Sequence, residues 1–112
     1  HELSITQSIL SIVLEKARAA QAKRVTQVSL TIGKLSGVVD DCVRFYFDLL
    51  SKDTIAAGAT LSFNQPPAKL RCRNCAHIFP PADLDWTCPN CHGQSVEIVS
   101  GRECFVESIE VE

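Results

Sequence analysis

The sequence has no methionine, no internal repeat and no low-complexity segment, which excludes repeat arrays and compositionally biased linkers. No apolar run approaches the roughly 18 residues that a membrane-spanning helix needs. Neither sign of charge dominates, since the formal net charge is −2 at pH 7. That balance argues against a nucleic-acid clamp and against a module for membrane surfaces. Because the chain begins at His1 and lacks methionine, we expect that an initiator methionine or a longer segment precedes it.

Catalytic motifs are also missing from the sequence. No nucleophile is placed beside a base, and no glycine-rich loop could cradle a phosphate. The pair Asp40-Asp41 could supply metal ligands or acid–base groups, but its place at the start of an expected helix favours capping. We therefore predict a protein that is not an enzyme.

The length and the cysteine content limit the number of domains and the redox compartment of the protein. A chain of 112 residues fits one domain, or one small domain that carries a metal-stapled subdomain. Hydrophobic residues make up 46% of the chain, which is enough for a modest core. Two of the six cysteines, Cys42 and Cys104, are isolated in the sequence, whereas the other four show metal-ligand spacing. This usage favours a reducing cytoplasm over a disulfide-bonded secreted protein.

The stretch from Cys72 to His92 contains two Cys-x-x-Cys pairs. The pairs are Cys72/Cys75 and Cys88/Cys91, and twelve residues separate them. Each short loop can turn two thiolates towards one point, and the spacing allows the two pairs to complete a tetrahedron. Four soft donors with no open position are what a structural zinc ion requires, so we predict Zn(II) at these four cysteines.

Other interpretations of the same cysteines stay open at this point. The pairs could be oxidised to disulfides, and the run ending in His92 has the form of a c-type haem attachment sequence. Four cysteines could also bind iron, as in a rubredoxin-like electron carrier. His77 and His92 could be alternate zinc ligands or could hydrogen-bond to the ligands, or they could be ordinary surface residues.

A basic cluster lies near the cysteine pairs in the sequence. It comprises Lys69, Arg71, Arg73 and Arg102. Four thiolates on one Zn(II) leave a net charge of −2, which these side chains can offset, and this weakens the case for phosphate contacts. A zinc-ribbon module that binds nucleic acid or protein nevertheless remains an alternative function.

Hydrophobic periodicity predicts two helices and three strands outside the cysteine stretch. Residues 5–21 show helical periodicity, with Ser4 and Gln7 in the positions of a capping box and an apolar stripe of Ile9, Val13, Ala17 and Ala20. Val25 to Ile32 alternates as a strand, with Val28, Leu30 and Ile32 on one face. A second helix follows Asp40-Asp41 and is marked by Val43, by Tyr46 or Phe47, and by Leu50. A second strand contains Leu61 and Phe63.

The chain after Gly101 returns to strand-like alternation. We expect Phe105, Glu107, Ile109 and Val111 on one face of this strand. Such a tail must pair with the sheet formed by the first two strands, so the zinc unit is expected to be an insertion. Within the zinc unit we expect Phe79, Leu84 and Trp86 to form a small core around the metal, with a strand near Val96 and Ile98.

The N-terminus offers a second, nitrogen-rich metal site. A terminal amine, ionisable backbone amides and the imidazole of His1 would suit square-planar Cu(II) or Ni(II). With a methionine ahead, His1 would give both its amide and its ring, and the methionine would give the amine. If His1 is the true terminus, the amide of Glu2 must join instead.

Motifs along the whole chain resemble the HypA/HybF family of nickel metallochaperones for [NiFe]-hydrogenase maturation. The motifs are His1-Glu2-Leu3-Ser4, Lys23-Arg24-Val25, Ile32-Gly33, the paired Cys-x-x-Cys closing in Cys91-His92-Gly93, and Ser108-Ile109-Glu110-Val111. The resemblance implies that His1, with Glu2 beside it, binds nickel, and that Cys72, Cys75, Cys88 and Cys91 hold structural zinc. It also implies a HypB-type GTPase and a hydrogenase large-subunit precursor as partners. The family sequence begins Met-His-Glu, and this chain lacks that methionine.

Together these observations predict an α+β fold in which two helices pack on a sheet of about three strands, with an inserted zinc-ribbon-like domain. The nickel-binding domain is expected to comprise residues 1–67 plus 101–112, and the zinc-binding domain residues 68–100. We predict a cytoplasmic, non-enzymatic nickel carrier with no nucleic-acid or membrane partner. Whether it forms a homo-oligomer is left open.

Overall fold

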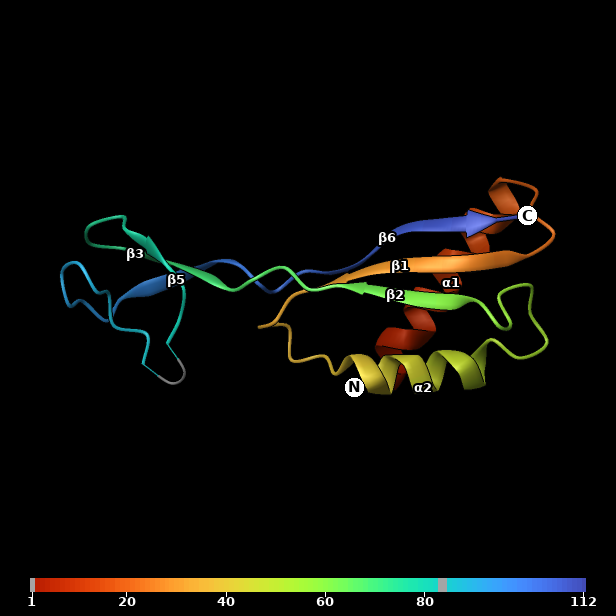
Figure 1. Ribbon diagram of the computed structural model, residues 1–112, viewed down its shortest axis with the longest axis horizontal. Coiled ribbons are helices and arrows are strands. Elements are labelled where there is room, and N and C mark those ends of the chain that lie inside the picture. The colour runs from red at the N-terminus through yellow and green to blue at the C-terminus, as the bar shows by residue number, and fades with distance from the viewer. Residues whose placement is uncertain (1, 83–84) are drawn as a thin grey trace.

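The computed structural model describes residues 2–82 and 85–112, so the predictions for His1 and Leu84 lie outside the described residues. The elements are α1 (Glu2–Ala19), β1 (Val25–Ile32), α2 (Asp40–Leu50), β2 (Thr60–Asn64), β3 (Lys69–Cys72), β4 (Ile78–Phe79), β5 (Val96–Ser100) and β6 (Cys104–Val111). The molecule measures 55 × 24 × 17 Å, and its two small sheets lie at opposite ends of the long axis (Figure 1). No described helix is both long and apolar enough to cross a membrane.

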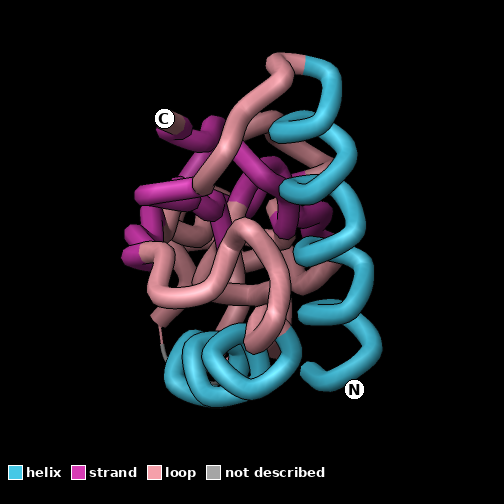
Figure 2. The backbone as a smooth tube through the Cα atoms, turned by 90° about the vertical axis from the view of Figure 1, so that its right-hand side faces the viewer, coloured by secondary structure: helices cyan, strands magenta, loops and turns pink. Residues whose placement is uncertain are grey.

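The first sheet has the strand order β2-β1-β6. The central strand β1 is parallel to β2 and antiparallel to β6, so the C-terminal strand returns to the sheet as the sequence predicted. Helix α1 crosses the strands on one face, whereas α2 runs along them (Figures 1 and 2). The segment with β3, β4 and β5 lies between β2 and β6 in the chain. The predicted α+β fold with an inserted unit is confirmed.

The main core lies between this sheet and the two helices. Its fully or nearly fully buried side chains come from α1, β1, α2, β2 and the loop before β2: Ile9, Val13, Ala17, Val25, Val28, Leu30, Ile32, Val43, Phe47, Ala56, Ala59 and Leu61. Burying a large apolar side chain such as Phe47 stabilises the fold by about 1.5–3 kcal/mol. The predicted helical stripe is confirmed at Ile9, Val13 and Ala17, but Ala20 is exposed because α1 ends at Ala19.

The start of α1 differs from the prediction. The helix begins at Glu2, so Ser4 lies inside it and cannot be its N-cap, and the predicted capping box is wrong. Thr6 is buried within the first turns and donates its hydroxyl hydrogen to the carbonyl oxygen of Glu2 at 2.6 Å. This bond satisfies the buried hydroxyl of Thr6 within the helix and does not cap it.

The expected capping at the start of α2 is confirmed in part, since Asp40 Oδ1 accepts the amide hydrogen of Asp41 at 2.9 Å. Asp40 and Asp41 occupy its first turn, where they complement the positive end of the helix dipole. The N-cap residue is Val39, which makes no side-chain capping bond. Its backbone amide instead donates to Glu2 Oε2 at 3.2 Å, across 37 residues of sequence. A carboxylate from α1 therefore anchors the N-cap residue at the start of α2.

Strand β6 does not alternate strictly. Ser108 pairs with Ser29 and Val106 pairs with Leu30, so Glu107 is an extra residue that forms a bulge. As a result Val106 and Ile109, three residues apart, both pack against the main core. The predicted single face of Phe105, Glu107, Ile109 and Val111 is wrong for this reason: Phe105 is 48% exposed and Val111 is 38% exposed.

The second sheet has the order β4-β3-β5, and both of its pairs are antiparallel. Among the residues that the structure describes, its buried core comprises Leu70, Cys72, Phe79 and Cys88. Val96 and Ile98 of β5 pack against this core, as expected. Trp86, which was expected inside it, is 36% exposed and does not belong to the buried cluster.

Candidate metal centre

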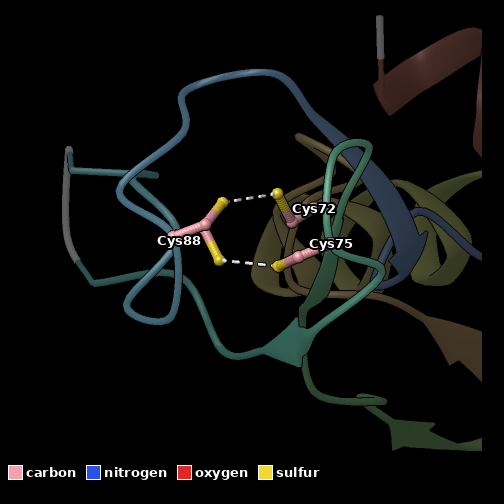
Figure 3. Close-up of side chains that lie close together, drawn as sticks. Cys72, Cys75 and Cys88 are labelled. Atoms are coloured by element: carbon pink, nitrogen blue, oxygen red, sulfur yellow. Dashed lines mark hydrogen bonds between the residues drawn. The ribbon is translucent and has the colours of Figure 1, made fainter.

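The four cysteines of the two Cys-x-x-Cys pairs converge at one point of the second sheet. Their sulfur atoms all lie within 4.8 Å of one another. The Sγ atoms of Cys72 and Cys91 are 3.4 Å apart, and those of Cys75 and Cys88 are 3.6 Å apart. Figure 3 shows Cys72 and Cys75 turned towards Cys88, which comes from a separate segment. Within residues 2–82 and 85–112, no other group of His, Cys, Asp or Glu gathers in this way.

The donor set and its dimensions fit a tetrahedral zinc ion. A Zn–S bond of about 2.3 Å places the sulfur atoms of a tetrahedral site about 3.8 Å apart. The two measured separations and the 4.8 Å limit agree with that size. All six cysteines, each of them in a described part of the chain, are free thiols, so neither pair has closed into a disulfide. A filled shell of four thiolates leaves no position open for a substrate.

The two cysteine loops have the same backbone geometry. In the first, Cys72 N donates to His77 O and Ala76 N donates to Cys72 O, both at 2.9 Å. In the second, Cys88 N donates to Gly93 O at 2.9 Å and His92 N to Cys88 O at 2.8 Å. Ala76 and His92 occupy equivalent positions, with φ values of 63° and 62°. This repeated turn directs both cysteines of each pair to the same side.

Hydrogen bonds from the loops favour the thiolate form of the first pair. The backbone amides of Cys75 and then Asn74 lower the pKa of Cys72. The side chain of Asn90, followed by the amide of His77, lowers the pKa of Cys75 to about 6. Asn90 Nδ2 lies 3.5 Å from Cys75 Sγ, so an amide of one loop supports a sulfur atom of the other.

The pKa of Cys91 is shifted in the opposite direction, upwards. The Gly93 amide lowers the pKa of Cys91, but the hydrogen bond with Cys72, burial and the other thiols outweigh it and raise that pKa to about 12. Four adjacent sulfur atoms cannot all ionise without a cation. Binding of a divalent ion must therefore release protons, and the apparent metal affinity of the site will rise with pH.

Three residues of this site were not identified from the sequence. Asn74 and Asn90 each stand just before the second cysteine of a pair, so both pairs read Cys-x-Asn-Cys, and this repetition was an available signal. Gly93 is the third. A Cβ added there would lie 2.8 Å from Asn74 Nδ2 and 3.3 Å from Cys91 Sγ, so a larger residue would displace the Asn74 side chain and crowd this thiol.

Replacing Asn90 by alanine should weaken metal binding without removing a ligand. We expect the zinc affinity to fall by about 10–100-fold, since loss of a hydrogen bond to a metal ligand has effects of this size. The pKa of Cys75 should rise because its largest stabilising contact is gone. Competition with a chromophoric chelator measures the affinity, and Gln94→Ala, an exposed residue of the same loop, is the matched control. An unchanged affinity in Asn90→Ala would show that the contact is incidental.

The two histidines near the cysteines lie outside the four-sulfur group. Both are exposed, and neither belongs to the cluster whose ligand atoms lie within 4.8 Å. The ring of His77 stacks on Phe79, with ring centroids 6.0 Å apart and an interplanar angle of 11°. This contact gives His77 a packing role in the small core.

At the N-terminus, the structure describes Glu2 but not His1. Glu2 is half-buried at the first position of α1, and its carboxylate accepts the hydrogen bond from Val39 N. This bond, followed by one from its own amide, lowers the pKa of Glu2, so the anchor persists at neutral pH and is lost as the pH falls through that lowered value. Of the two predicted nickel residues, the structure therefore describes only Glu2.

The sequence and the structure were compared with those of known proteins. A family model described as "HypA: Hydrogenase/urease nickel incorporation, metallochaperone, hypA" matches residues 1–111. Hydrogenase maturation factor HypA of Dehalococcoides mccartyi (strain CBDB1) is 48% identical over 112 residues, which cover 100% of this chain and 94% of the relative. Hydrogenase maturation factor HybF of Escherichia coli O157:H7 is 39% identical over 112 residues, covering 100% and 99%. The solution structure of the Ni metallochaperone HypA from Helicobacter pylori aligns with a TM-score of 0.69 at 27% identity, covering 99% of this chain and 97% of that one.

The match extends over nearly the whole chain and includes both the first sheet with its helices and the cysteine unit. It agrees with the resemblance expected from the N-terminal and cysteine motifs. The chain belongs to the HypA family of nickel-incorporation metallochaperones and hydrogenase maturation factors.

Proposed function

We propose that this protein binds Ni(II) at its N-terminus, through His1 and Glu2, and delivers it for [NiFe]-hydrogenase maturation. Membership of a nickel-incorporation family supports this function. The structural observation that carries the proposal is the start of α1 at Glu2, directly after His1. A chelate built on the terminal amine, the imidazole of His1 and nearby backbone amides would then form at the end of an ordered helix.

The helix end suits a site that must both hold and release a cation. The first amides of an α-helix have no intrahelical backbone acceptor, and the amide of Glu2 bonds only to its own carboxylate, a contact that it would exchange for the metal on joining the chelate. A deprotonated amide is favoured at the positive end of the helix dipole, whereas the metal cation is disfavoured there. These opposing effects favour moderate affinity. The Glu2 carboxylate, bound to Val39 N, acts in this proposal as an anchor for the first turn and not as a ligand.

For the four-cysteine site we propose Zn(II) as the resident ion. Cys72, Cys75, Cys88 and Cys91 would hold it, and when bound it would supply a fixed cross-link with no reactive position. Its contribution is structural because the unit buries few apolar side chains of its own. The ion to be transferred is then the nickel at His1, which is cargo.

We further propose that the chain has two domains. Residues 1–67 plus 101–112 would form the nickel-binding domain, and residues 68–100 the zinc-binding domain. The two buried clusters share no residue, which supports this division. Each domain would thus depend on a different source of stability: apolar burial for the first and the metal for the second.

The partners of such a carrier would be a HypB-type GTPase and the hydrogenase large-subunit precursor, in the cytoplasm. The relatives named hydrogenase maturation factors support partners in that process. Transfer would proceed by ligand exchange when a partner docks, and it would need no catalytic group in this chain. The zinc-binding domain would then shape the surface that partners recognise.

Replacing His1 by alanine tests the nickel site. We expect the nickel affinity to fall by tenfold or more, because one ring nitrogen is lost from the chelate. Isothermal titration of Ni(II) into zinc-loaded wild type and His1→Ala measures this, with His77→Ala as the control for an exposed histidine elsewhere. A blocked or extended N-terminus should act like His1→Ala. Equal nickel binding in wild type and His1→Ala would refute the carrier function in this form.

The alternative, a zinc-ribbon module for nucleic acid or protein without a nickel role, has less support. It rested on Arg71 and Arg73, and Arg71 Nη1 lies 3.1 Å from Glu97 Oε1, which offsets part of that charge. Fluorescence anisotropy with labelled single- and double-stranded oligonucleotides would detect such binding. Salt-dependent binding that falls in Arg73→Ala, together with no nickel binding, would favour the alternative.

A further inference from the structure

The loop between β1 and α2 is hydrogen-bonded at its start to the chain before β6 and at its end to α1. We call residues 33–39 the strap. At its start, Gly33 N donates to Glu103 O at 2.7 Å and Leu35 N donates to Gly101 O at 2.6 Å. At its end, Val39 N donates to Glu2 Oε2 at 3.2 Å. The strap is thus tied both to the chain that leaves the cysteine unit and to the first residue of α1.

The first attachment of the strap is a close backbone crossing. A Cβ added to Gly33 would lie 2.2 Å from both the carbonyl carbon and the oxygen of Gly101. Gly101 is buried and has a φ of 112°, a conformation that L side chains rarely adopt. The segment therefore has little freedom to shift sideways at this point.

Glu103 holds this crossing in shape. Its carboxylate oxygen Oε1 accepts the amide hydrogen of Gly101 at 2.7 Å, while its backbone oxygen accepts that of Gly33. One residue therefore fixes the turn at Gly101 and binds the start of the strap. A carboxylate that accepts from a backbone amide in a half-buried position makes a charge-assisted bond, which is stronger than a neutral one.

The interior of the strap is braced by short-range bonds. Ser36 N donates to Gly33 O at 3.1 Å, and Val38 N donates to Ser36 Oγ at 3.2 Å. These bonds link Gly33 through Ser36 to Val38, the residue before Val39, so a displacement at Gly33 can be passed along the strap. Because Val39 N is bound to the Glu2 carboxylate, the position of the first turn of α1 depends on the strap.

We propose that Glu103 is a positioning residue for the N-terminal metal site, acting through the strap on Glu2. The inference rests on the proposed function, in that it concerns nickel binding at His1 and Glu2. Glu103 itself touches no metal ligand of either site in the described residues. Its carboxylate keeps the strap in register, and the strap keeps the Glu2 amide where the chelate forms.

A purely structural role for Glu103 would lower stability but leave Val39 and nickel binding unchanged. Four variants separate these roles in the zinc-loaded protein. Glu103→Ala removes the acceptor for Gly101, Glu103→Gln keeps an amide oxygen there, and Glu103→Asp shortens the carboxylate by one methylene. Glu107→Ala, on the same strand, removes an acceptor for Thr31 and does not contact the strap, so it is the matched control.

The measurements are NMR hydrogen exchange at Val39, and nickel affinity by titration. In Glu103→Ala we expect the Val39 amide to exchange about tenfold faster and the nickel affinity to fall about fivefold, as one lost charge-assisted bond would allow. Glu103→Gln should restore most of both values, and Glu107→Ala should change neither. Glu103→Asp should show the same changes at smaller size, and it replaces the alanine variant if that variant does not fold.

Two results would overturn the proposal. Unchanged exchange at Val39 in Glu103→Ala would show that the strap does not transmit the contact. Faster exchange with unchanged nickel affinity would show that the strap does not position the metal site. If the wild type binds no nickel at its N-terminus, the proposed function fails separately, and the positioning role for nickel fails with it. The exchange data then still decide whether Glu103 holds Val39 against Glu2.

Discussion

Replacing Cys75 by serine is expected to unfold the cysteine unit and leave the helices folded. The serine hydroxyl is a poor zinc ligand, so the proposed ion would lose one of four donors as well as the sulfur supported by Asn90. Losing only a hydrogen bond to a metal ligand lowers the affinity by up to about 100-fold. We therefore expect the loss of a ligand itself to lower the zinc affinity by more than about 100-fold. A structural zinc ion supplies the folding free energy of a unit this small.

The burial pattern explains why the effect should stay local. Among the described residues of the cysteine unit, four form its buried core, and two of them, Cys72 and Cys88, are proposed metal ligands. Without the ion, Leu70 and Phe79 remain as the other buried residues described there, and two such side chains cannot offset the conformational entropy of the unit. The main core shares none of these residues.

The two parts of the molecule can be followed separately in this variant. Trp86 is the only tryptophan and lies in the cysteine unit, so its fluorescence reports on that unit, whereas far-UV circular dichroism reports on α1 and α2. Cys42→Ser, an exposed cysteine on α2, controls for the loss of a thiol. Equal protease resistance of both parts in Cys75→Ser would contradict the prediction.

Local periodicity was sufficient to predict β1 and the faces of the helices. The strand Val25–Ile32 has the predicted bounds. Its apolar residues are mostly β-branched, and such residues are enriched in strands. The same was true of the α1 stripe through Ile9, Val13 and Ala17. The two Cys-x-x-Cys pairs were predictable for a similar reason, since each is a short local loop.

The errors came from contacts between residues far apart in the chain. Asp40 accepts the Asp41 amide locally, but the amide of the N-cap residue Val39 is bound by a carboxylate 37 residues away, which no local rule could indicate. The bulge at Glu107 depends on the register against β1, where the carboxylate Oε2 accepts the Thr31 hydroxyl hydrogen at 2.8 Å. A strict period of two cannot show where one extra residue is accommodated.

The prediction for the small core was confirmed at Phe79, which is buried, and wrong at Trp86. Trp86 looked like a core residue by size, yet Leu70 of β3 fills the interior, beside Cys72 and Cys88. The size of an apolar side chain does not predict its burial in a unit whose buried centre includes cysteines such as Cys72 and Cys88. The repeated Asn74 and Asn90 carried more information about this site than the aromatic residue did.

Gly33→Ala is expected to lower the free energy of unfolding by about 3 kcal/mol, because overpacking against backbone has costs at the upper end of the usual range. The added Cβ would lie 2.2 Å from the carbonyl carbon and oxygen of Gly101, and 2.7 Å from Glu103 Oε1. Gly101 cannot simply retreat, because the position of its own missing Cβ is already 2.9 Å from the Cα of Ala68. Three backbone segments therefore meet without room for one methyl group.

Gly37→Ala is the matched control for this substitution within the same loop. Gly37 has a φ of 77° and nothing within 4 Å of an added Cβ, so its alanine variant should lose only about 1 kcal/mol through backbone strain. Denaturant unfolding followed by far-UV circular dichroism measures both variants, with zinc content checked to show that the cysteine unit is intact. If Gly33→Ala were no less stable than Gly37→Ala, the crossing at Gly101 would be able to open at little cost. The strap would then be too loose to position Glu2, so the same measurement also bears on the role assigned to Glu103.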